Sequence, residues 1–499
     1  MVASSTCSNE LQTNWRNVRA ISLFTFVDSL QFSFYMWSFW PYIQQIDPTM
    51  GTTFVGIIMA ISGVGEAVAA PIFGMWSNRI GRILPPVYAS MVMSTIGNVL
   101  YLILGAFSAA LIPWVLILSR FLSGAGSGNR GCFRALVAAN SQGRDRAKAL
   151  ASSGGAALVG LTIGPSVQVL FTWMGSEGHR VGPILLSQYT APALLALILN
   201  ALTTVYLHYK VDDCLDPYGQ DVNLSKTESK AVIVKSEEVH PDSDAESAAP
   251  AKIVLRMDVV AVVICMGTRA IRMLVTANME SIGAPFTEIM FGFSHAEALE
   301  WNSYGQTAVG ALTIATFLVY AFTDYTKRIS ERANCIGALI GLAAFYTLTM
   351  PWPFLGGSVD CTPFVGNGTH GWQWCETLAP INRWLYYITY ALFYGIALSV
   401  LNNSLQALYS RVLGSGPQGT MQGVNQAVGS ISRIIGPLVM SSTFSEWGPR
   451  ATWGCVLILL ALTLLSWFGA YRRLVPLELR KPRPSAIVPI HLAPKEVSV

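Results

Sequence analysis

The sequence has little charge. Only 12% of its 499 residues are Asp, Glu, Lys or Arg, whereas 52% are hydrophobic. A soluble globular chain carries about 25% charged residues. The shortage excludes an ordinary soluble domain of this length and indicates a chain whose solvent is largely lipid.

The sequence also lacks the patterns of catalytic and cofactor sites. No two of its six His residues have metal-ligand spacing, and it contains no GxxxxGKS/T loop. The Gly-rich stretch 124–129 follows an apolar helix and not a strand, which argues against a dinucleotide site. We therefore expect a protein that is not an enzyme, with no cofactor, no metal site and no nucleic-acid partner.

Cysteines are scarce, and so is any sign of a cleaved leader. Eight cysteines over this length do not make a disulfide scaffold. The first residues have no short apolar core that ends in a small-residue cleavage site. We interpret residues 1–17 as a cytosolic tail and not as a signal peptide.

Long apolar windows follow this tail. Spans of about 20 residues cross a bilayer, and twelve such windows occur near residues 18–40, 54–77, 83–107, 111–136, 149–173, 188–209, 257–280, 301–323, 333–352, 381–408, 418–443 and 450–471. The polar interval 210–256 divides them six and six. It is acidic, Ser-rich and poor in aromatics, which is typical of a disordered linker. We expect six-helix bundles at 18–209 and 257–471, joined by this linker and followed by a tail at 472–499.

The basic residues predict the orientation. With the N-terminus in the cytosol, cytosolic segments hold 23 of the 32 Lys and Arg residues, including all nine lysines. The opposite loops hold only Arg180 and Arg450. This asymmetry is the positive-inside pattern, and it places both termini in the cytosol.

The loop at 353–380 is expected on the opposite side. Asn367 begins an NGT sequon there, whereas the other two sequons lie in the linker and inside a span, so Asn367 is the expected glycosylation site. Cys361 and Cys375 are the only cysteines on this oxidising side, and we expect them to form a disulfide. Two free thiols are the alternative.

The two halves repeat each other. Gly164-Pro165 in the fifth window aligns with Gly436-Pro437 in the eleventh, and residues 74–82 align with 320–328. Two six-helix halves built from a repeat, with a binding site at the midplane between them, are a known transporter architecture.

Three motifs resemble those of the major facilitator superfamily. They are GMWSNRIGR at 74–82, Arg120 with FLSGAGSG in the fourth window, and GLTIGP in the fifth. The resemblance implies an all-α membrane protein with twelve transmembrane helices in two pseudo-symmetric halves. It assigns conformational roles to Gly74, Asn78, Arg79, Gly81, Arg82, Gly164, Pro165, Gly436 and Pro437. Asn78 stands where the superfamily usually has Asp, so it lacks the charge that would favour a helix N-terminus.

Residues 38–79 and 124–135 are further similar to the lysosomal major-facilitator subfamily linked to neuronal ceroid lipofuscinosis. That resemblance implies an endolysosomal membrane protein that handles anions, notably chloride. Tyr409 and Tyr471 begin tyrosine sorting patterns, so sorting adaptors are candidate partners besides the bilayer. We expect a monomer.

Charged residues inside the windows point to the substrate. A charge at the membrane centre costs about 2.5 to 3.5 kcal/mol. The arginines are Arg120, Arg130, Arg134, Arg269, Arg272 and Arg433, and the carboxylates are Asp28, Glu66 and Glu280. Because a wet cavity with excess arginine attracts anions, we predict an anion bound by Arg269, Arg272 and Arg433, with support from Arg120 and Arg130.

Other roles stay open at this point. Arg120 could instead hold the fourth span to its neighbours, and Arg134 could snorkel to headgroups. Asp28, Glu66 and Glu280 are either counter-ions or proton carriers. The leading hypothesis is an endolysosomal transport protein for an anion, with chloride or another halide favoured, as channel or carrier. The alternatives are a proton-coupled carrier of a small organic solute, sugar or lipid that uses Asp28 or Glu66, and a non-transporting scaffold.

Overall fold

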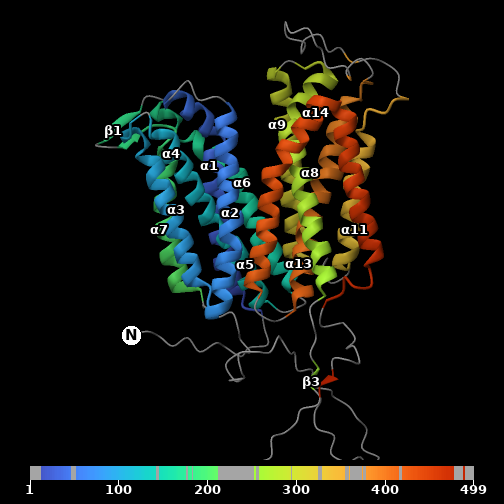
Figure 1. Cartoon of the computed structure of the whole chain (residues 1–499), viewed down its shortest axis with the longest axis horizontal. Coiled ribbons are helices and arrows are strands. Elements are labelled where there is room, and N and C mark those ends of the chain that lie inside the picture. Colours follow the sequence, from blue (N-terminus) through green and yellow to red (C-terminus); the bar gives the residue numbers. More distant parts are fainter. Residues whose placement is uncertain are drawn as a thin grey trace, which may run out of the picture.

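The computed structural model shows two helical bundles side by side (Figure 1). The structure describes residues 13–46, 52–108, 110–141, 145–175, 178–181, 184–211, 252–253, 258–293, 295–323, 329–354, 359, 374, 378–414, 418–476 and 487–488. Helices cover each of the predicted windows, which confirms the helical fold class.

The N-terminal bundle holds the first seven α-helices, together with short 3₁₀ turns. They are α1 (Trp15–Ile46), α2 (Thr52–Ile80), α3 (Leu84–Leu102), η1 (Leu104–Ala106), α4 (Ile112–Gly126), η2 (Ser127–Asn129), α5 (Arg130–Ala139), α6 (Arg146–Val169), η3 (Thr172–Met174) and α7 (Ala191–Lys210). The fourth predicted window contains both α4 and α5, because η2 tightens the chain between them. Strands β1 (His179–Val181) and β2 (Ile184–Leu186) form an antiparallel pair between α6 and α7.

The C-terminal bundle begins at Val259. Its helices are α8 (Val259–Phe291), α9 (His295–Phe322), α11 (Glu331–Leu348), α12 (Arg383–Thr389), the π-helix η6 (Tyr390–Gly395), α13 (Ile396–Leu413) and α14 (Gly419–Gly469). Helix α14 covers the last two windows, and Gly448, at φ 78°, breaks it just before Pro449. Trp374, from the chain between α11 and α12, donates a hydrogen bond to the Ser445 carbonyl, 3.2 Å away, beside this break.

One short strand pair lies outside the bundles. Strand β3 (Lys252–Ile253), in the predicted linker, pairs antiparallel with β4 (Ile487–Val488) in the predicted C-terminal tail. Most of both segments lies outside the described residues, so the linker and the tail remain predictions.

Length and composition alone make four helical stretches of the described chain long and apolar enough to cross a membrane. They are 191–210, 259–283, 383–413 and 419–469. The first of the four is α7 of the N-terminal bundle, and the other three lie in the C-terminal bundle.

The two bundles are packed in different ways. In the N-terminal bundle, Gly124 of α4 lies directly against the backbone of Ser62 in α2, where a Cβ atom would overlap it. Small residues of this kind let helix backbones approach closely in lipid. In the C-terminal bundle many aromatic rings pack together, since Phe286 stacks on Trp453 at 4.2 Å and Tyr390 stacks on Tyr394 at 4.9 Å.

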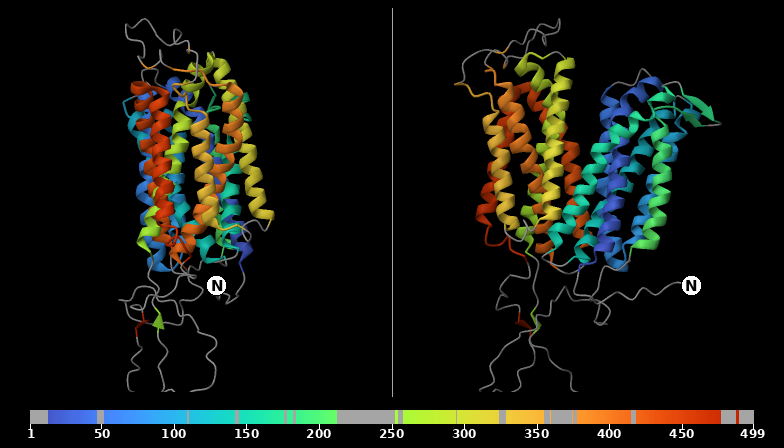
Figure 2. Two further views of the ribbon diagram at one scale, coloured as in Figure 1. Left: turned by 90° about the vertical axis from the view of Figure 1, so that its right-hand side faces the viewer. Right: turned by 180° about the vertical axis from the view of Figure 1, so that it is seen from behind.

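The bundles meet at one end. We call it the basic end, because it carries Arg79, Arg82 and Arg411 where α2 and α13 finish and α14 begins. Gly74 of α2 lies against the backbone of Gly419, the first residue of α14. Figures 1 and 2 show the ribbons of the two halves approaching at this lower end and diverging toward the end that carries β1, which we call the far end.

Candidate functional site

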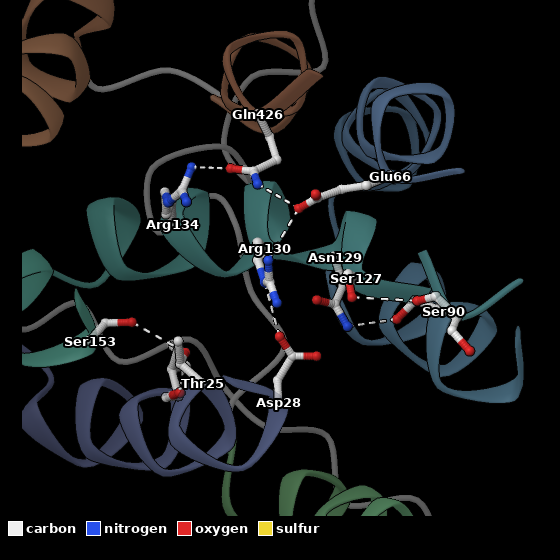
Figure 3. A network of polar contacts seen from close by, with 12 residues as sticks. Thr25, Asp28, Glu66, Ser90, Ser127, Asn129, Arg130, Arg134, Ser153 and Gln426 are labelled. Carbon is white, nitrogen blue, oxygen red and sulfur yellow. Dashed lines mark hydrogen bonds and ion pairs between the residues drawn. The ribbon is translucent and has the colours of Figure 1, made fainter. Parts of the chain in front are cut away.

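A network of charged and amide side chains joins the two halves between the basic end and the middle of the bundles (Figure 3). Its members include Asp28 of α1, Glu66 of α2, Arg130 and Arg134 of α5, and Gln426 of α14. Gln426 lies seven residues after the start of α14, which is roughly 10 Å along the helix from the basic end.

Arg130 is the cation of the N-terminal half of this network. Its Nε donates to Asp28 Oδ2 at 2.9 Å, and its Nη1 lies 3.3 Å from Glu66 Oε1. The turn η2 precedes Arg130 and is anchored by Asn129, whose Nδ2 donates to Ser90 Oγ at 2.8 Å. The sequence therefore ties the tightened segment to α3, and this places the guanidinium between two carboxylates.

Gln426 connects the halves. Its Oε1 accepts one hydrogen bond from Arg134 Nη1 and another from Arg269 Nη2, both at 2.6 Å. Its Nε2 donates to Glu66 Oε1, also at 2.6 Å. The side chain is buried, with the residue 4% exposed. Arg134 and Glu66 belong to the N-terminal half, so two of these three bonds cross between the bundles.

Arg134 differs from the snorkelling interpretation. Its guanidinium points into the molecule toward Gln426 and does not turn to headgroups. The physical reason is that Gln426 supplies an acceptor inside, which a side chain near a helix end otherwise seeks in water. A neutral Gln inside an apolar window was the available signal, since polar side chains bond across helices in membranes.

Arg269 reaches Gln426 through a gap left by a glycine. A Cβ atom on Gly429 of α14 would lie 2.7 Å from Arg269 Nε. Arg269 is 3% exposed, and its Nε has no hydrogen-bond partner in the described part of the chain. The guanidinium is thus buried and only partly satisfied, although unpaired buried polar groups are costly.

Arg272 and Arg433 are more accessible than Arg269. Arg272 is half-buried, and its one hydrogen-bond contact among the described residues is a weak one, from Nη2 to Met273 Sδ at 3.5 Å. Arg433 is exposed and lies within electrostatic reach of Arg269 and Arg272. On α14 it projects between Ile434, which faces α2, and Gly436, which faces α8. Its exposure is therefore toward the space between the halves and not toward lipid.

Glu280 is a carboxylate that interacts electrostatically with both arginines of this pair. It lies on α8 eight residues after Arg272 and is exposed. Arg433 and Arg272 both interact with it electrostatically, but no hydrogen bond to it is seen within the described ranges. The structure thus brings Asp28, Glu66 and Arg130 together. It places Arg269, Arg272 and Arg433 beside them, and Glu280 lies beyond Arg272 along α8.

Arg120 lies apart, inside the N-terminal bundle. Its guanidinium sits over the Tyr101 ring of α3, 4.7 Å from the ring centroid. This cation–π contact favours the structural alternative for Arg120 over a supporting role in anion binding.

The motif at 74–82 closes the basic end. Asn78 Oδ1 accepts from the backbone N–H of Gly419 at 2.9 Å, and its Nδ2 donates to Thr420 Oγ1 at 2.9 Å. A neutral amide thus caps the first turn of α14, where orphan N–H groups need acceptors. Gly81, at φ 66°, follows the end of α2, and Arg79 and Arg82 are exposed beside it.

The Gly-Pro pairs of the repeat occupy equivalent positions in the two halves. Gly164 of α6 lies against Ser33 of α1, and Gly436 of α14 lies against Ala277 of α8. Pro437 lies inside α14, whereas the side chain of Pro165 is not among the described ones. Asn367, Cys361 and Cys375 fall outside the described residues, so glycosylation and the disulfide remain predictions.

Two helical bundles joined by a polar network are the arrangement of a known class of membrane transporters. The family model described as Major Facilitator Superfamily matches residues 21–437. The chain belongs to this superfamily, whose members are generally carriers and not enzymes.

Known proteins of this class resemble the chain over most of its length. Major facilitator superfamily domain-containing protein 8 of Xenopus laevis is 26% identical over 504 aligned residues, covering 95% of this chain and 94% of that protein. The class D tetracycline resistance protein of Salmonella ordonez is also 26% identical, over 392 residues, covering 78% and 80%.

Solved structures show the same fold. The human organic anion transporter MFSD10 superposes with a TM-score of 0.61 at 17% identity, covering 91% of this chain and 99% of that one. The fucose:proton symporter of E. coli gives a TM-score of 0.60 at 12% identity, covering 92% and 98%.

Proposed function

We propose that this transporter moves a small anion through the space between its two halves. The observation that carries the proposal is the charge of the C-terminal half, where Arg269, Arg272 and Arg433 lie close together without an ion-paired carboxylate among the described residues. Guanidinium clusters that line a path attract anions and repel cations. Arg272 and Arg433 form the accessible part of the site, and an anion contacts them first.

Chloride or another halide is the first candidate, and a small organic anion is the second. Arg272 and Arg433 supply charge and donors that either kind of anion can use. The fold-level likeness to a human organic anion transporter is compatible with the second candidate. Channel and carrier modes both use this site.

A proton-coupled carrier is a second candidate function. It is favoured by Asp28 and Glu66, which share the single guanidinium of Arg130. A proton taken up by either carboxylate changes the charge balance at Arg130. Uptake of solute driven by a pH gradient, and lost in Asp28→Asn, would support this candidate over simple anion movement.

Location and topology belong to the same proposal. The protein resides in the endolysosomal membrane, with both termini and the basic end in the cytosol, because basic residues collect there. Asn367 then carries a glycan on the luminal side, and Cys361 pairs with Cys375. Loss of a mobility shift in Asn367→Gln after glycosidase treatment tests this orientation.

The decisive experiment is flux in liposomes. Purified wild type is reconstituted with a chloride or small-carboxylate gradient and compared with Arg272→Gln and Arg433→Gln. Both variants should lose at least tenfold in flux. Arg383→Gln is the matched control, because Arg383 is an exposed arginine of the same half that packs 5.6 Å from the Trp384 ring at the far end. Equal flux in all four proteins would refute the site.

A further inference from the structure

Two guanidinium groups converge on one neutral oxygen in the buried network. Arg134 Nη1 and Arg269 Nη2 each lie 2.6 Å from Gln426 Oε1, although Arg134 belongs to α5 and Arg269 to α8. The two cations also repel each other across this oxygen. An uncharged amide offsets little of that repulsion, since hydrogen bonds are stronger when donor and acceptor carry opposite charge.

A second observation points to the same place. Arg269 Nε is buried and has no hydrogen-bond partner in the described ranges, and it packs so closely on Gly429 that a Cβ atom there would lie 2.7 Å from it. A buried donor without a partner costs about 1–3 kcal/mol. The position of Gln426 Oε1 is therefore one where a negative charge fits the surrounding donors better than the amide does.

We propose that the position now held by Gln426 Oε1 is an inner anion site. This inference rests on the proposed anion transport and deepens it: Arg272 and Arg433 receive the anion, and Arg134 and Arg269 take it next by displacing the amide. The ligand class is a halide or a singly charged oxyanion, because the space between the two guanidiniums is that of one acceptor atom.

Displacement has a structural consequence. Gln426 makes two bonds across the halves, from Arg134 to its Oε1 and from its Nε2 to Glu66 Oε1. When an anion takes the two guanidiniums, the amide loses the Arg134 bond and its fixed orientation toward Glu66. The ligand thus weakens the contact that holds the basic end closed, and this links occupancy of the inner site to opening.

The first test measures binding through thermal unfolding. The full-length protein in detergent is titrated with chloride, and separately with inorganic phosphate, at constant ionic strength with gluconate as the balancing anion. A bound ligand raises the unfolding midpoint by mass action. In Gln426→Met the anion has no amide to displace, so the half-saturating concentration should fall at least threefold. Gln422→Met is the matched control, one turn earlier on α14 and bonded to Gln418, and it should match wild type.

The second test moves the charge. The double variant Glu66→Gln/Gln426→Glu exchanges the amide and the carboxylate of this pair. The amide is then at position 66, and the negative charge is at position 426, against Arg134 and Arg269. This tethered carboxylate should occupy the inner site, so the response to chloride and phosphate should shrink to the part that Arg272 and Arg433 contribute. It should also preserve closure, which is read as oxidative cross-linking of Asn78→Cys with Thr420→Cys, whose parent side chains are 2.9 Å apart. Chloride should slow this cross-link several-fold in the wild-type background and leave it unchanged in the double variant.

The outcomes separate this inference from the proposed function. Identical titrations of wild type, Gln426→Met and the double variant, or no midpoint shift with either anion, would overturn the inner site. If flux then still fell in Arg272→Gln and Arg433→Gln, anion transport would stand without it. If wild type carried no anion flux but Gln426→Met bound chloride more tightly, the inner site would stand while the proposed function failed.

Discussion

Arg130 of the N-terminal half and the arginines of the C-terminal half have different partners, and Arg134 of the N-terminal half, which bonds to the neutral Gln426, resembles the latter. In the N-terminal half, Arg130 lies between Asp28 and Glu66, so its charge is neutralised by direct ion pairs. In the C-terminal half, Arg269 and Arg272 have only a neutral oxygen and a sulfur as hydrogen-bond acceptors among the described residues. The difference teaches where a ligand can matter. A completed ion pair stabilises the fold, whereas a guanidinium whose hydrogen-bond acceptors are neutral can still bind an anion.

Removing Arg130 is expected to have the largest effect, and it tests whether the ion pairs of the N-terminal half stabilise the fold. Arg130→Met leaves two carboxylates without their cation, and breaking a buried pair in this way costs about 3–5 kcal/mol of stability. The thermal unfolding midpoint in detergent should fall clearly, whereas the surface variant Arg383→Met should unfold like wild type. A fall in Arg130→Met no larger than in the control would mean that the ion pairs contribute nothing.

The glycine beside Arg269 gives the next largest effect. In Gly429→Ala the new Cβ would lie 2.7 Å from Arg269 Nε, so the guanidinium must shift away from Gln426. Overpacking of this kind costs about 1–3 kcal/mol. The unfolding midpoint and the anion flux should both decrease.

Gly267→Ala is the control for that change, because no atom outside the local backbone of α8 lies within 4 Å of a Cβ built on Gly267. It should leave stability and flux as they are. Equal effects of the two substitutions would show that helix propensity, and not the space beside Arg269, explains the loss.

Removing charge from the C-terminal half should affect flux more than stability, which is the reverse of what is expected for Arg130. In Arg272→Gln and Arg433→Gln, flux should fall at least tenfold, which corresponds to about 1.4 kcal/mol. Stability should change by less than in Arg130→Met, or rise, because repulsion among the arginines is relieved. Thermal unfolding and liposome flux on the same preparations measure both quantities. A stability loss as large as that of Arg130→Met would erase the distinction between the halves.

The smallest expected effect concerns Asn78. In Asn78→Asp a charge is added where the side chain caps α14, and an acidic residue at a helix N-terminus contributes about 0.3–1 kcal/mol. The closed basic end should be favoured, so flux should fall about two- to fivefold while the unfolding midpoint rises slightly. Asn78→Ala, which removes the cap, should shift both quantities in the opposite direction, and a matching shift in the two variants would contradict the capping role.

Much of the architecture was predictable, because it depends on local composition. Apolar windows, the polar interval and the glycine motifs each follow from a short stretch of sequence, and the superfamily match confirms the fold that they predicted. Asp28, Glu66 and Arg130 were identifiable as charges inside windows. That they contact one another was not, since contact depends on how three helices are rotated and staggered.

Gln426 and Arg134 show where the prediction stopped. Gln426 carries no charge, so a search for charged residues passes over it, and its role arises from side chains of three other helices. For Arg134 the sequence leaves snorkelling to headgroups open as one role. Its acceptor lies 292 residues away in the sequence, and no local sequence pattern predicts such a distant partner.

The turn at Gly448 carries a mechanical consequence for the far end. The Trp374 ring occupies the place where any side chain at Gly448 would have to go, and its indole holds the Ser445 carbonyl. The segment that precedes α12 is thereby fastened to the tip of the helix that bears Gln426 and Arg433. A tilt of that helix at the basic end would therefore move this segment. Opening of the contact at Gln426 would in this way change the surface at the far end.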